Sequence, residues 1–344
     1  MKKRTRNIIR VLLFAGTAIS LFFVPWDLLK IRLTPASDTI QEQVNAAIDM
    51  GLDGIIVYVD KAGSEPQIYT AGWNNRADQI PAEPDVLFKI ASISKLYIAA
   101  ATAKLVAADS LSLDKTLAEY LPELKDSIEY SDQITLKMMV NHTSGIYNYS
   151  NHPDFPWAEP PGNAEALRFA LNQPANFKPG TQYRYSNTNY LLLGEILDKT
   201  LGYSHHKYIK KEIVNKLGLT DTYNLLSEVN ADDVMSGYYV GYEPDIKAQD
   251  YVNPGGSMVA TISDVGIFLR ALNDGTLLND EEQKIYESIY EFNHTGELPG
   301  YLSIARYHKD LDAVVVQFVN TSGGTSWSKM EIVYNRIIGI LKEN

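Results

Sequence analysis

A serine lies one helical turn before a lysine in the stretch 88–95, which reads FKIASISK. The pair is Ser92 and Lys95, and residues 96–106 after it are rich in alanine and aliphatic side chains without proline or glycine, which predicts a helix. Residues three apart on a helix share a face, so the Ser92 hydroxyl and the Lys95 amine can meet. Burial and, at a helix N-terminus, the helix dipole favour a neutral amine, which can accept the serine proton. The pair therefore predicts a serine nucleophile activated by a lysine base.

The serine–lysine spacing alone does not identify a nucleophile, because it occurs three more times in the chain. A solvated helix face explains those three pairs equally well, and they are Ser112/Lys115, Ser204/Lys207 and Ser326/Lys329. What distinguishes Ser92 is that two further polar groups follow it along the chain in a fixed order.

The first of these groups is Tyr185 and Asn187, in a polar stretch that leads into the helical run 191–197. A phenol can relay a proton, and an amide can hold both a lysine and a substrate. The triplet is weak by itself, since Tyr-x-Asn also occurs at Tyr149/Asn151 and at Tyr251/Asn253. Its position after Ser92 in the chain makes the assignment of Tyr185 and Asn187 to the site more specific.

The second group is His294, Thr295 and Gly296, followed by Glu297 and two strand-like runs. A glycine at position 296 would let a substrate lie close against a strand backbone. We therefore expect residues 294–297 to form a substrate-binding edge beside Ser92.

With these three groups in order, the chain resembles the serine beta-lactamase-related superfamily, in the class C-like branch that also holds D-alanyl-D-alanine carboxypeptidases, D-aminopeptidases and esterases. The S-x-x-K arrangement is that of penicillin-binding enzymes. The likeness runs from about residue 40 to the C-terminus and includes the stretches 112–122, 141–146 and 255–261. It implies a beta-lactamase/transpeptidase-like fold and acyl transfer through a serine ester, with Ser92 as nucleophile, Lys95 as base and Tyr185 as the proton donor to the leaving group.

The resemblance also implies roles in substrate binding for Asn187 and for residues 294–297. Asn187 would orient Lys95 and a substrate amide. The backbone N–H groups of Ser92 and Glu297 would form an oxyanion hole, in which each donor lowers the barrier by ~3 kcal/mol. This chemistry needs no metal and no organic cofactor.

Position 294 separates the activities within the superfamily. Its beta-lactamases usually place a lysine there as a fixed charge for the substrate carboxylate, whereas an unperturbed His294 is half-charged only around pH ~6.5. Histidine resembles the carboxypeptidase, aminopeptidase and esterase members, and the Glu297 carboxylate would repel anionic substrates. We therefore expect peptidase or esterase activity ahead of efficient beta-lactam hydrolysis. A beta-lactamase proper and a catalytically silent penicillin-binding-type protein remain as alternatives.

Other candidate residues have plainer explanations. His205 and His206 are neighbours on an expected helix and point apart, which disfavours a metal site. His142 is expected to cap a turn. The chain has no G-x-S-x-G nucleophile elbow, which disfavours an α/β-hydrolase. The tyrosine-rich segments 147–149 and 238–242 can equally line a cleft or serve packing.

The expected secondary structure is strand-rich at both ends and helical in the middle. Hairpins are predicted near each end and helices beside them, with a helix at 38–50 capped by Ser37 or Asp38, strands at 54–59, 67–71, 301–307 and 313–319, a helix at 329–341 and mostly helix from 92 to about 275. This order predicts an α+β fold in which helices flank an antiparallel sheet and an all-helical subdomain is inserted. We expect one catalytic domain, residues 35–344.

Composition narrows the class of protein. The chain has 344 residues, 45% of them hydrophobic, and can bury a large core. It contains no cysteine, which excludes disulfides and a thiol nucleophile. Beyond residue 34 it carries 24 Lys and Arg against 41 Asp and Glu, which argues against a nucleic-acid partner. The expected partner is a small-molecule or peptide substrate, including cell-wall peptides; composition does not set the oligomeric state.

The N-terminus differs in kind from the rest of the chain. Five cations (Lys2, Lys3, Arg4, Arg6 and Arg10) precede the apolar run 11–26, which predicts a signal sequence or a signal anchor. No small-x-small cleavage site follows, and Trp26 suits a membrane interface. We expect residues 1–34 to be a retained single-pass membrane anchor and linker, with the catalytic domain on the periplasmic or extracellular side. Secretion after cleavage is the alternative.

Overall fold

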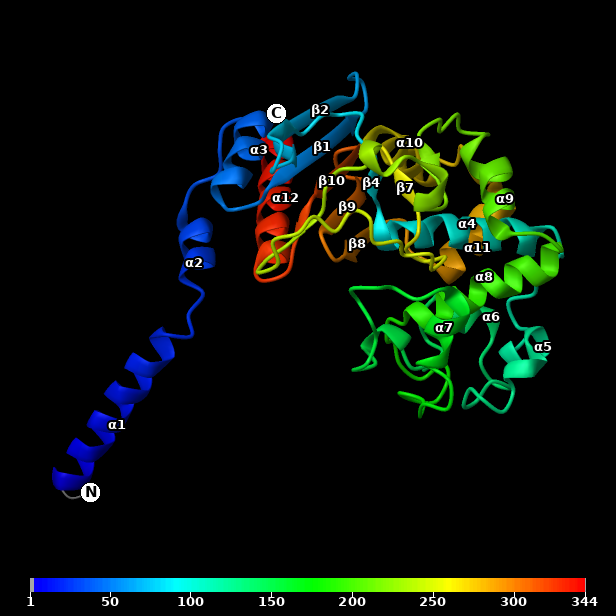
Figure 1. Ribbon diagram of the computed structural model, residues 1–344, viewed down its shortest axis with the longest axis horizontal. Coiled ribbons are helices and arrows are strands. Elements are labelled where there is room, and N and C mark those ends of the chain that lie inside the picture. The colour runs from blue at the N-terminus through cyan, green and yellow to red at the C-terminus, as the bar shows by residue number, and fades with distance from the viewer. Residues whose placement is uncertain (1–2, 344) are drawn as a thin grey trace.

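The computed structural model describes residues 3–343, so Met1, Lys2 and Asn344 lie outside the described residues. Its centre is an antiparallel sheet with the strand order β3-β2-β1-β10-β9-β8 (Figure 1). The strands are β1 (Gly54–Lys61), β2 (Gln67–Asn75), β3 (Ile80–Pro81), β8 (His294–Leu298), β9 (Tyr301–His308) and β10 (Ala313–Val319). β1 pairs with β10, so the two predicted hairpins meet in one sheet, and the α+β prediction is confirmed.

The central strand β1 is buried on both faces by alternating side chains. Ile55, Val57 and Val59 face one apolar cluster, while Ile56 and Tyr58 face the other. This is the two-residue period of a strand between two layers.

One face of the sheet is covered by helices from the two ends of the chain, α3 (Ile40–Asp49) and α12 (Ser326–Glu343), which also contact each other (Figure 1). The predicted cap of the first helix is wrong by one or two residues. Thr39 is the N-cap, because its hydroxyl accepts from the backbone N–H of Glu42 while the Glu42 carboxylate accepts from the backbone N–H of Thr39. This reciprocal capping box satisfies two N–H groups of the first turn and fixes where the helix begins.

The other face is covered by α10 (Ile262–Asn273), and beyond it lies the helical region built from the middle of the chain. The centre of that region is α4 (Ser94–Ala107), which is buried on nearly all sides from Ser94 to Leu105. The remaining helices are α5 (Leu117–Tyr120), α6 (Leu136–Val140), α7 (Asn163–Arg168), α8 (Asn187–Leu201), α9 (His205–Ile209) and α11 (Asp280–Ile289).

Five further strands of two residues each form two small sheets outside the main sheet. They are β4 (Phe88–Lys89), β5 (Thr222–Tyr223), β6 (Tyr238–Tyr239), β7 (Val259–Ala260) and β11 (Thr321–Ser322). β7 lies between β4 and β5, and β6 pairs in parallel with β11. Strand β4 directly precedes the short turn that leads into α4.

The N-terminal segment consists of α1 (Lys3–Leu21) and α2 (Trp26–Leu33), and α1 projects away from the rest of the molecule in Figure 1. No single helix in the described part of the chain is both long and apolar enough to cross a membrane; the bent pair Leu12–Leu21 and Trp26–Leu33, which meet at 75°, passes by length and composition together. Arg336 of α12 donates hydrogen bonds to the backbone oxygens of Ile31 and Thr34. The end of α2 is thus bonded to α12, which covers the sheet.

Candidate active site

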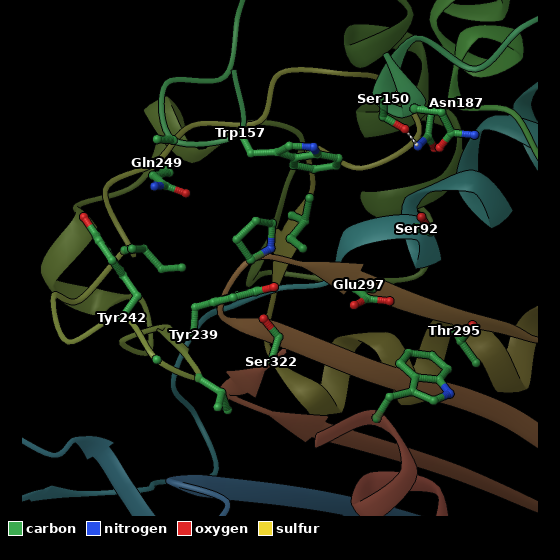
Figure 2. Close-up of a pocket in the computed structure, with 18 of the residues that line it drawn as sticks. Ser92, Ser150, Trp157, Asn187, Tyr239, Tyr242, Gln249, Thr295, Glu297 and Ser322 are labelled. Carbon is green, nitrogen blue, oxygen red and sulfur yellow. Dashed lines mark hydrogen bonds between the residues drawn. The ribbon is translucent and has the colours of Figure 1, made fainter. Parts of the chain in front are cut away.

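A cavity of about 940 Å³ opens between the edge of the sheet and the helical region, and Ser92 lies at one end of it (Figure 2). The expected site residues Tyr185, Asn187, His294, Thr295 and Glu297 also line it. None of the three other serine–lysine pairs, all within the described residues, lines this cavity. The structure thus brings together the three groups that the sequence places in order.

Ser92 lies in a single 3₁₀ turn, 91–93, between β4 and α4. The turn is tight: Ala91 has φ +52, and the Ser94 hydroxyl donates to the Ala91 carbonyl at 2.6 Å. A non-glycine residue in the left-handed region costs of order 1 kcal/mol and persists where packing holds it. Packing does so here, since α4 is apolar on nearly all sides and its N-terminal end is fixed in the core with Ser92 facing the cavity.

Lys95 is completely buried beneath Ser92, and its Nζ has three polar neighbours. The distances are 3.2 Å to Ser92 Oγ, 2.9 Å to Asn187 Oδ1 and 2.7 Å to the backbone oxygen of Gly255. Burial holds the pKa of Lys95 well below its usual value. A neutral amine has two N–H groups, which match the two carbonyl acceptors, and one lone pair, which is left for the Ser92 hydroxyl.

Gly255 is required for this arrangement because of its small size. A Cβ at position 255 would lie 2.8 Å from Lys95 Nζ and 2.8 Å from the Tyr190 side chain. Only glycine lets the backbone carbonyl approach the lysine this closely.

Asn187 is the first residue of α8, and three polar groups hold it. Its Nδ2 donates to Ser150 Oγ at 3.2 Å, and its backbone N–H donates to Asn148 Oδ1 at 3.1 Å. The backbone N–H of Ser186, just before it, donates to His142 Nδ1 at 3.2 Å. These contacts fix which way Asn187 Oδ1 points, and so fix one acceptor of Lys95.

Tyr185 completes the group around the nucleophile. Its hydroxyl donates to Ser92 Oγ at 2.7 Å, and its ring packs against the His142 imidazole with centroids 4.5 Å apart. Burial raises the pKa of Tyr185 above its usual value, so the phenol stays protonated and remains a donor. His142 is itself buried, and burial lowers its pKa to about 2, which keeps the ring neutral. Its position agrees with a structural role in the turn before Tyr185.

The edge strand β8 passes beside the Ser92 turn, and Gly296 lies where the two are closest. A Cβ on Gly296 would lie 2.5 Å from the Ile90 carbonyl oxygen, 2.9 Å from Ala91 Cβ and 2.3 Å from Ser303 Oγ. Gly296 therefore makes room for the turn that carries Ser92. That it also lets a substrate lie close to the strand stays a prediction.

The backbone of β8 offers free N–H groups on the side facing Ser92. Leu298 and Tyr301 pair across the two-residue turn 299–300, so alternate residues of β8 bond to β9 from that point. The N–H groups of Thr295 and Glu297 then point away from β9, toward the edge of the sheet, where no further strand pairs within residues 3–343. Because β8 contacts the 91–93 turn, the Glu297 N–H is available beside Ser92.

The hydrogen bonds and the pKa of His294 differ from those of the pH-dependent anion contact that the sequence predicts. Its Nδ1 faces the Thr295 carbonyl, which only accepts, so Nδ1 carries the proton and Nε2 accepts from the Tyr290 hydroxyl at 2.7 Å. Burial lowers the pKa of His294 to about 4. The ring is neutral near pH 7 with both nitrogens occupied, so it does not supply the positive charge that a lysine would.

The described lining of the cavity contains an acidic side chain but no lysine or arginine. Lys95 lies beneath Ser92 with its pKa lowered. Glu297 is the one acidic residue of that lining; its side chain is exposed within the cavity (Figure 2), and partial burial raises its pKa. A carboxylate and no cation make this a poor site for an anionic ligand.

Several contacting residues were not predicted from the sequence. Three of them lie far along the chain from the residue they contact, and these are Gly255, Asn148 and Ser150. The fourth, Tyr290, lies in the segment before His294. Of the tyrosine-rich segments, 238–242 contributes Tyr239 and Tyr242 to the cavity, whereas Tyr147 and Tyr149 do not line it. His205 pairs with Asp198 at 2.7 Å, at the junction of α8 and α9.

Comparison with known proteins places the chain among related sequences and folds. The Beta-lactamase family model matches residues 44–289. The mouse (Mus musculus) serine beta-lactamase-like protein LACTB, mitochondrial, is 25% identical over 334 aligned residues; they span 74% of this chain but only 58% of that relative.

The fold is also found in solved structures of other proteins. The crystal structure of D-amino acid amidase from Ochrobactrum anthropi SV3 superposes with a TM-score of 0.79 at 22% identity, covering 88% of this chain and 97% of the amidase. The penicillin binding protein from Bacillus halodurans gives 0.71 at 21% identity, covering 87% and 99%. The resemblance inferred from the ordered motifs is confirmed.

Proposed function

The chain belongs to the beta-lactamase family and is a serine hydrolase of the beta-lactamase and penicillin-binding protein type, and from this premise we propose that it cleaves esters or amides through an acyl-enzyme on Ser92. One observation carries the proposal. Lys95 Nζ has carbonyl acceptors for two N–H groups and has Ser92 Oγ as its third neighbour. A neutral amine held in this way is a base aimed at the hydroxyl.

In the proposed reaction, Ser92 Oγ attacks the substrate carbonyl carbon while its proton passes to Lys95. The N–H groups of Ser92 and Glu297 stabilise the oxyanion. Tyr185, hydrogen-bonded to Ser92 Oγ at 2.7 Å, gives its proton to the leaving oxygen or nitrogen as the carbon–leaving group bond breaks, and the Lys95 ammonium restores it. Water then hydrolyses the Ser92 ester. The two steps together consume one water and regenerate the neutral amine and the phenol.

The charge of the cavity sets the preferred substrates within this proposal. With His294 neutral and Glu297 on the wall, a substrate carboxylate finds no ionic partner. We therefore rank D-aminopeptidase-like amidase and esterase activity above D-alanyl-D-alanine carboxypeptidase and beta-lactamase activity, since the latter two act on substrates that carry a carboxylate.

A hydrolysis panel tests the proposal on the full-length protein. The substrates are p-nitrophenyl butyrate, a D-amino acid amide, a D-Ala-D-Ala peptide and nitrocefin. We expect the first two to be turned over fastest and Ser92→Ala to lose ~10⁴- to 10⁶-fold in kcat, with Ser112→Ala as the control that keeps its activity. Equal activity of the Ser92→Ala protein would contradict the assignment, and so would hydrolysis of none of the four substrates.

Membrane attachment through the N-terminal segment is part of the same proposal. The apolar side chains of Leu12, Phe14, Phe22 and Phe23 are exposed, and Trp26 follows them. Protease added to spheroplasts should digest the catalytic domain while the intact N-terminal segment stays in the membrane fraction. A soluble mature form that begins after Trp26 would instead identify a cleaved signal.

A further inference from the structure

The end of the cavity away from Ser92 is walled mainly by apolar and aromatic side chains, together with the polar Gln249 and Ser322. We name this region the apolar arm and define it by Trp157, Tyr239, Val240, Tyr242, Leu298 and Pro299. In Figure 2, Ser92 and Tyr242 lie at opposite ends of the cavity, with Trp157 and Tyr239 on facing walls. Tyr239, Val240 and Tyr242 remain 45%, 52% and 51% exposed. A group of large apolar side chains left open inside a cavity is typical of a ligand site.

The base of the segment 239–242 is firmly held. The backbone N–H of Val240 donates to the Ser322 carbonyl at 2.9 Å, and β6 pairs with β11. The hydroxyl of Tyr238 accepts from the backbone N–H of Arg76 at 2.9 Å, and the Arg76 guanidinium lies 4.1 Å above its ring. The open apolar side chains are thus presented by an anchored backbone.

The ring of Tyr239 packs against Gly323, which has no side chain. A Cβ on Gly323 would lie 2.9 Å from this ring, so the glycine leaves the space that the ring fills. The Tyr239 hydroxyl points into the middle of the cavity in Figure 2. A wall that is in place before the ligand arrives binds it with less loss of conformational entropy.

The arm is continuous with the reactive end. Leu298 and Pro299 directly follow Glu297, whose N–H is the proposed oxyanion donor. A group attached to the acyl carbon would therefore run along Leu298 and Pro299 toward Tyr239. The described lining of the cavity has no cation to hold an anionic group. The volume of the cavity, about 940 Å³, is typical of a site for a drug-sized ligand.

We propose that the apolar arm binds a bulky, uncharged apolar portion of the acyl group, such as a medium-length alkyl chain, and that the substrates are esters or amides whose acyl group carries such a portion. The inference rests on the proposed function, because it takes the acyl carbon to be at Ser92. It names the substrate class that the reactive end leaves open.

A series of p-nitrophenyl esters from acetate to octanoate tests the inference by turnover. We expect kcat/KM to rise about fourfold per added methylene until the arm is filled, since burying each CH₂ contributes ~0.8 kcal/mol. Tyr239→Ala, and the more conservative Val240→Ser, should lower the octanoate-to-acetate ratio at least about tenfold. Tyr203→Ala, a tyrosine of similar exposure outside the cavity lining, is the matched control and should keep the wild-type ratio. A ratio unchanged in both arm variants would overturn the inference.

Binding without turnover separates this inference from the proposed function. Methyl ketones of increasing chain length are titrated into the Ser92→Ala protein by calorimetry. Affinity should rise with chain length, and the rise should be lost when Tyr239→Ala is added. Equal affinities for short and long ketones would overturn the inference even if wild-type esters are hydrolysed. Chain-length-dependent binding together with an inert wild-type enzyme would support the arm and refute the proposed hydrolysis alone.

Discussion

The two ends of the cavity are built on opposite principles. At the reactive end, Lys95 is fully buried, and the side chains of Lys95, Tyr185 and Asn187 each have hydrogen-bond partners on fixed elements. At the apolar arm, Tyr239 and Tyr242 are about half exposed and contribute mainly apolar surface. The reactive end therefore sets the chemistry through hydrogen-bond geometry, whereas the arm sets the choice of acyl group through buried area. The two can be altered separately.

The largest effect is expected from Lys95→Met, which removes the base and keeps an unbranched side chain of similar length. General-base catalysis contributes 10²–10⁴-fold, so kcat/KM should fall by about 10³-fold or more for every substrate, short or long. Stopped-flow or steady-state hydrolysis of acetate and octanoate esters measures this. If the loss differed by more than about tenfold between the two esters, the two ends would not be independent.

A smaller effect is expected from Tyr185→Phe, which removes the hydroxyl 2.7 Å from Ser92 Oγ and keeps the ring packed on His142. The loss should be about 10²-fold and should be greater for an amide than for a p-nitrophenyl ester, because an amine must be protonated to leave and p-nitrophenolate need not be. Comparison of kcat for the two substrates tests this. Equal losses would place Tyr185 in packing instead of proton transfer.

His294→Lys probes the charge of the reactive end. A permanent ammonium would supply the missing partner for a substrate carboxylate, at roughly 1.5–3 kcal/mol for a charge-assisted hydrogen bond. That corresponds to about ten- to a hundredfold in kcat/KM for nitrocefin or a D-Ala-D-Ala peptide, reduced by the nearby Glu297. Neutral esters should change little. Equal changes for anionic and neutral substrates would show that the side chain at position 294 does not bind the substrate carboxylate.

The smallest effect concerns pH. Because burial lowers the pKa of Lys95 and the neutral amine is the active form, kcat/KM should fall as the pH is lowered through that pKa. His294, with a pKa of about 4, is already neutral at higher pH and should add no inflection near pH ~6.5. The profiles of wild type and His294→Gln should therefore overlay from about pH 5.5 to about pH 8. An inflection near pH ~6.5 that disappears in His294→Gln would contradict this account.

Sequence reasoning could pair Ser92 with Lys95 from local geometry, whereas Tyr185, Asn187 and residues 294–297 were placed by the order of the motifs and by the resemblance to the family. Ser92 and Lys95 are one turn apart, and the residues after each motif begin a helix or a strand. It could also predict the main sheet, since strands at both ends of the chain with alternating burial have few other ways to pair.

What escaped prediction depends on contacts that the sequence motifs do not contain. The Gly255 carbonyl that accepts from Lys95 is 160 residues away in sequence. The protonation of His294 is set by its bond to Tyr290 and by its burial, neither of which the motif contains. The role of Gly296 depends on the approach of Ile90 from another element. The apolar arm combines residues of β6 and β8 with residues of loops, and no sequence spacing predicts such a combination.

The most direct test of the central claim is the site of covalent labelling. The full-length protein is treated with an uncharged fluorophosphonate, digested and examined by mass spectrometry, with Lys95→Met treated in parallel. The account predicts a single adduct on the peptide that contains Ser92, formed much more slowly in the Lys95→Met protein. An adduct on Ser112, Ser204 or Ser326, or none on Ser92, would contradict it.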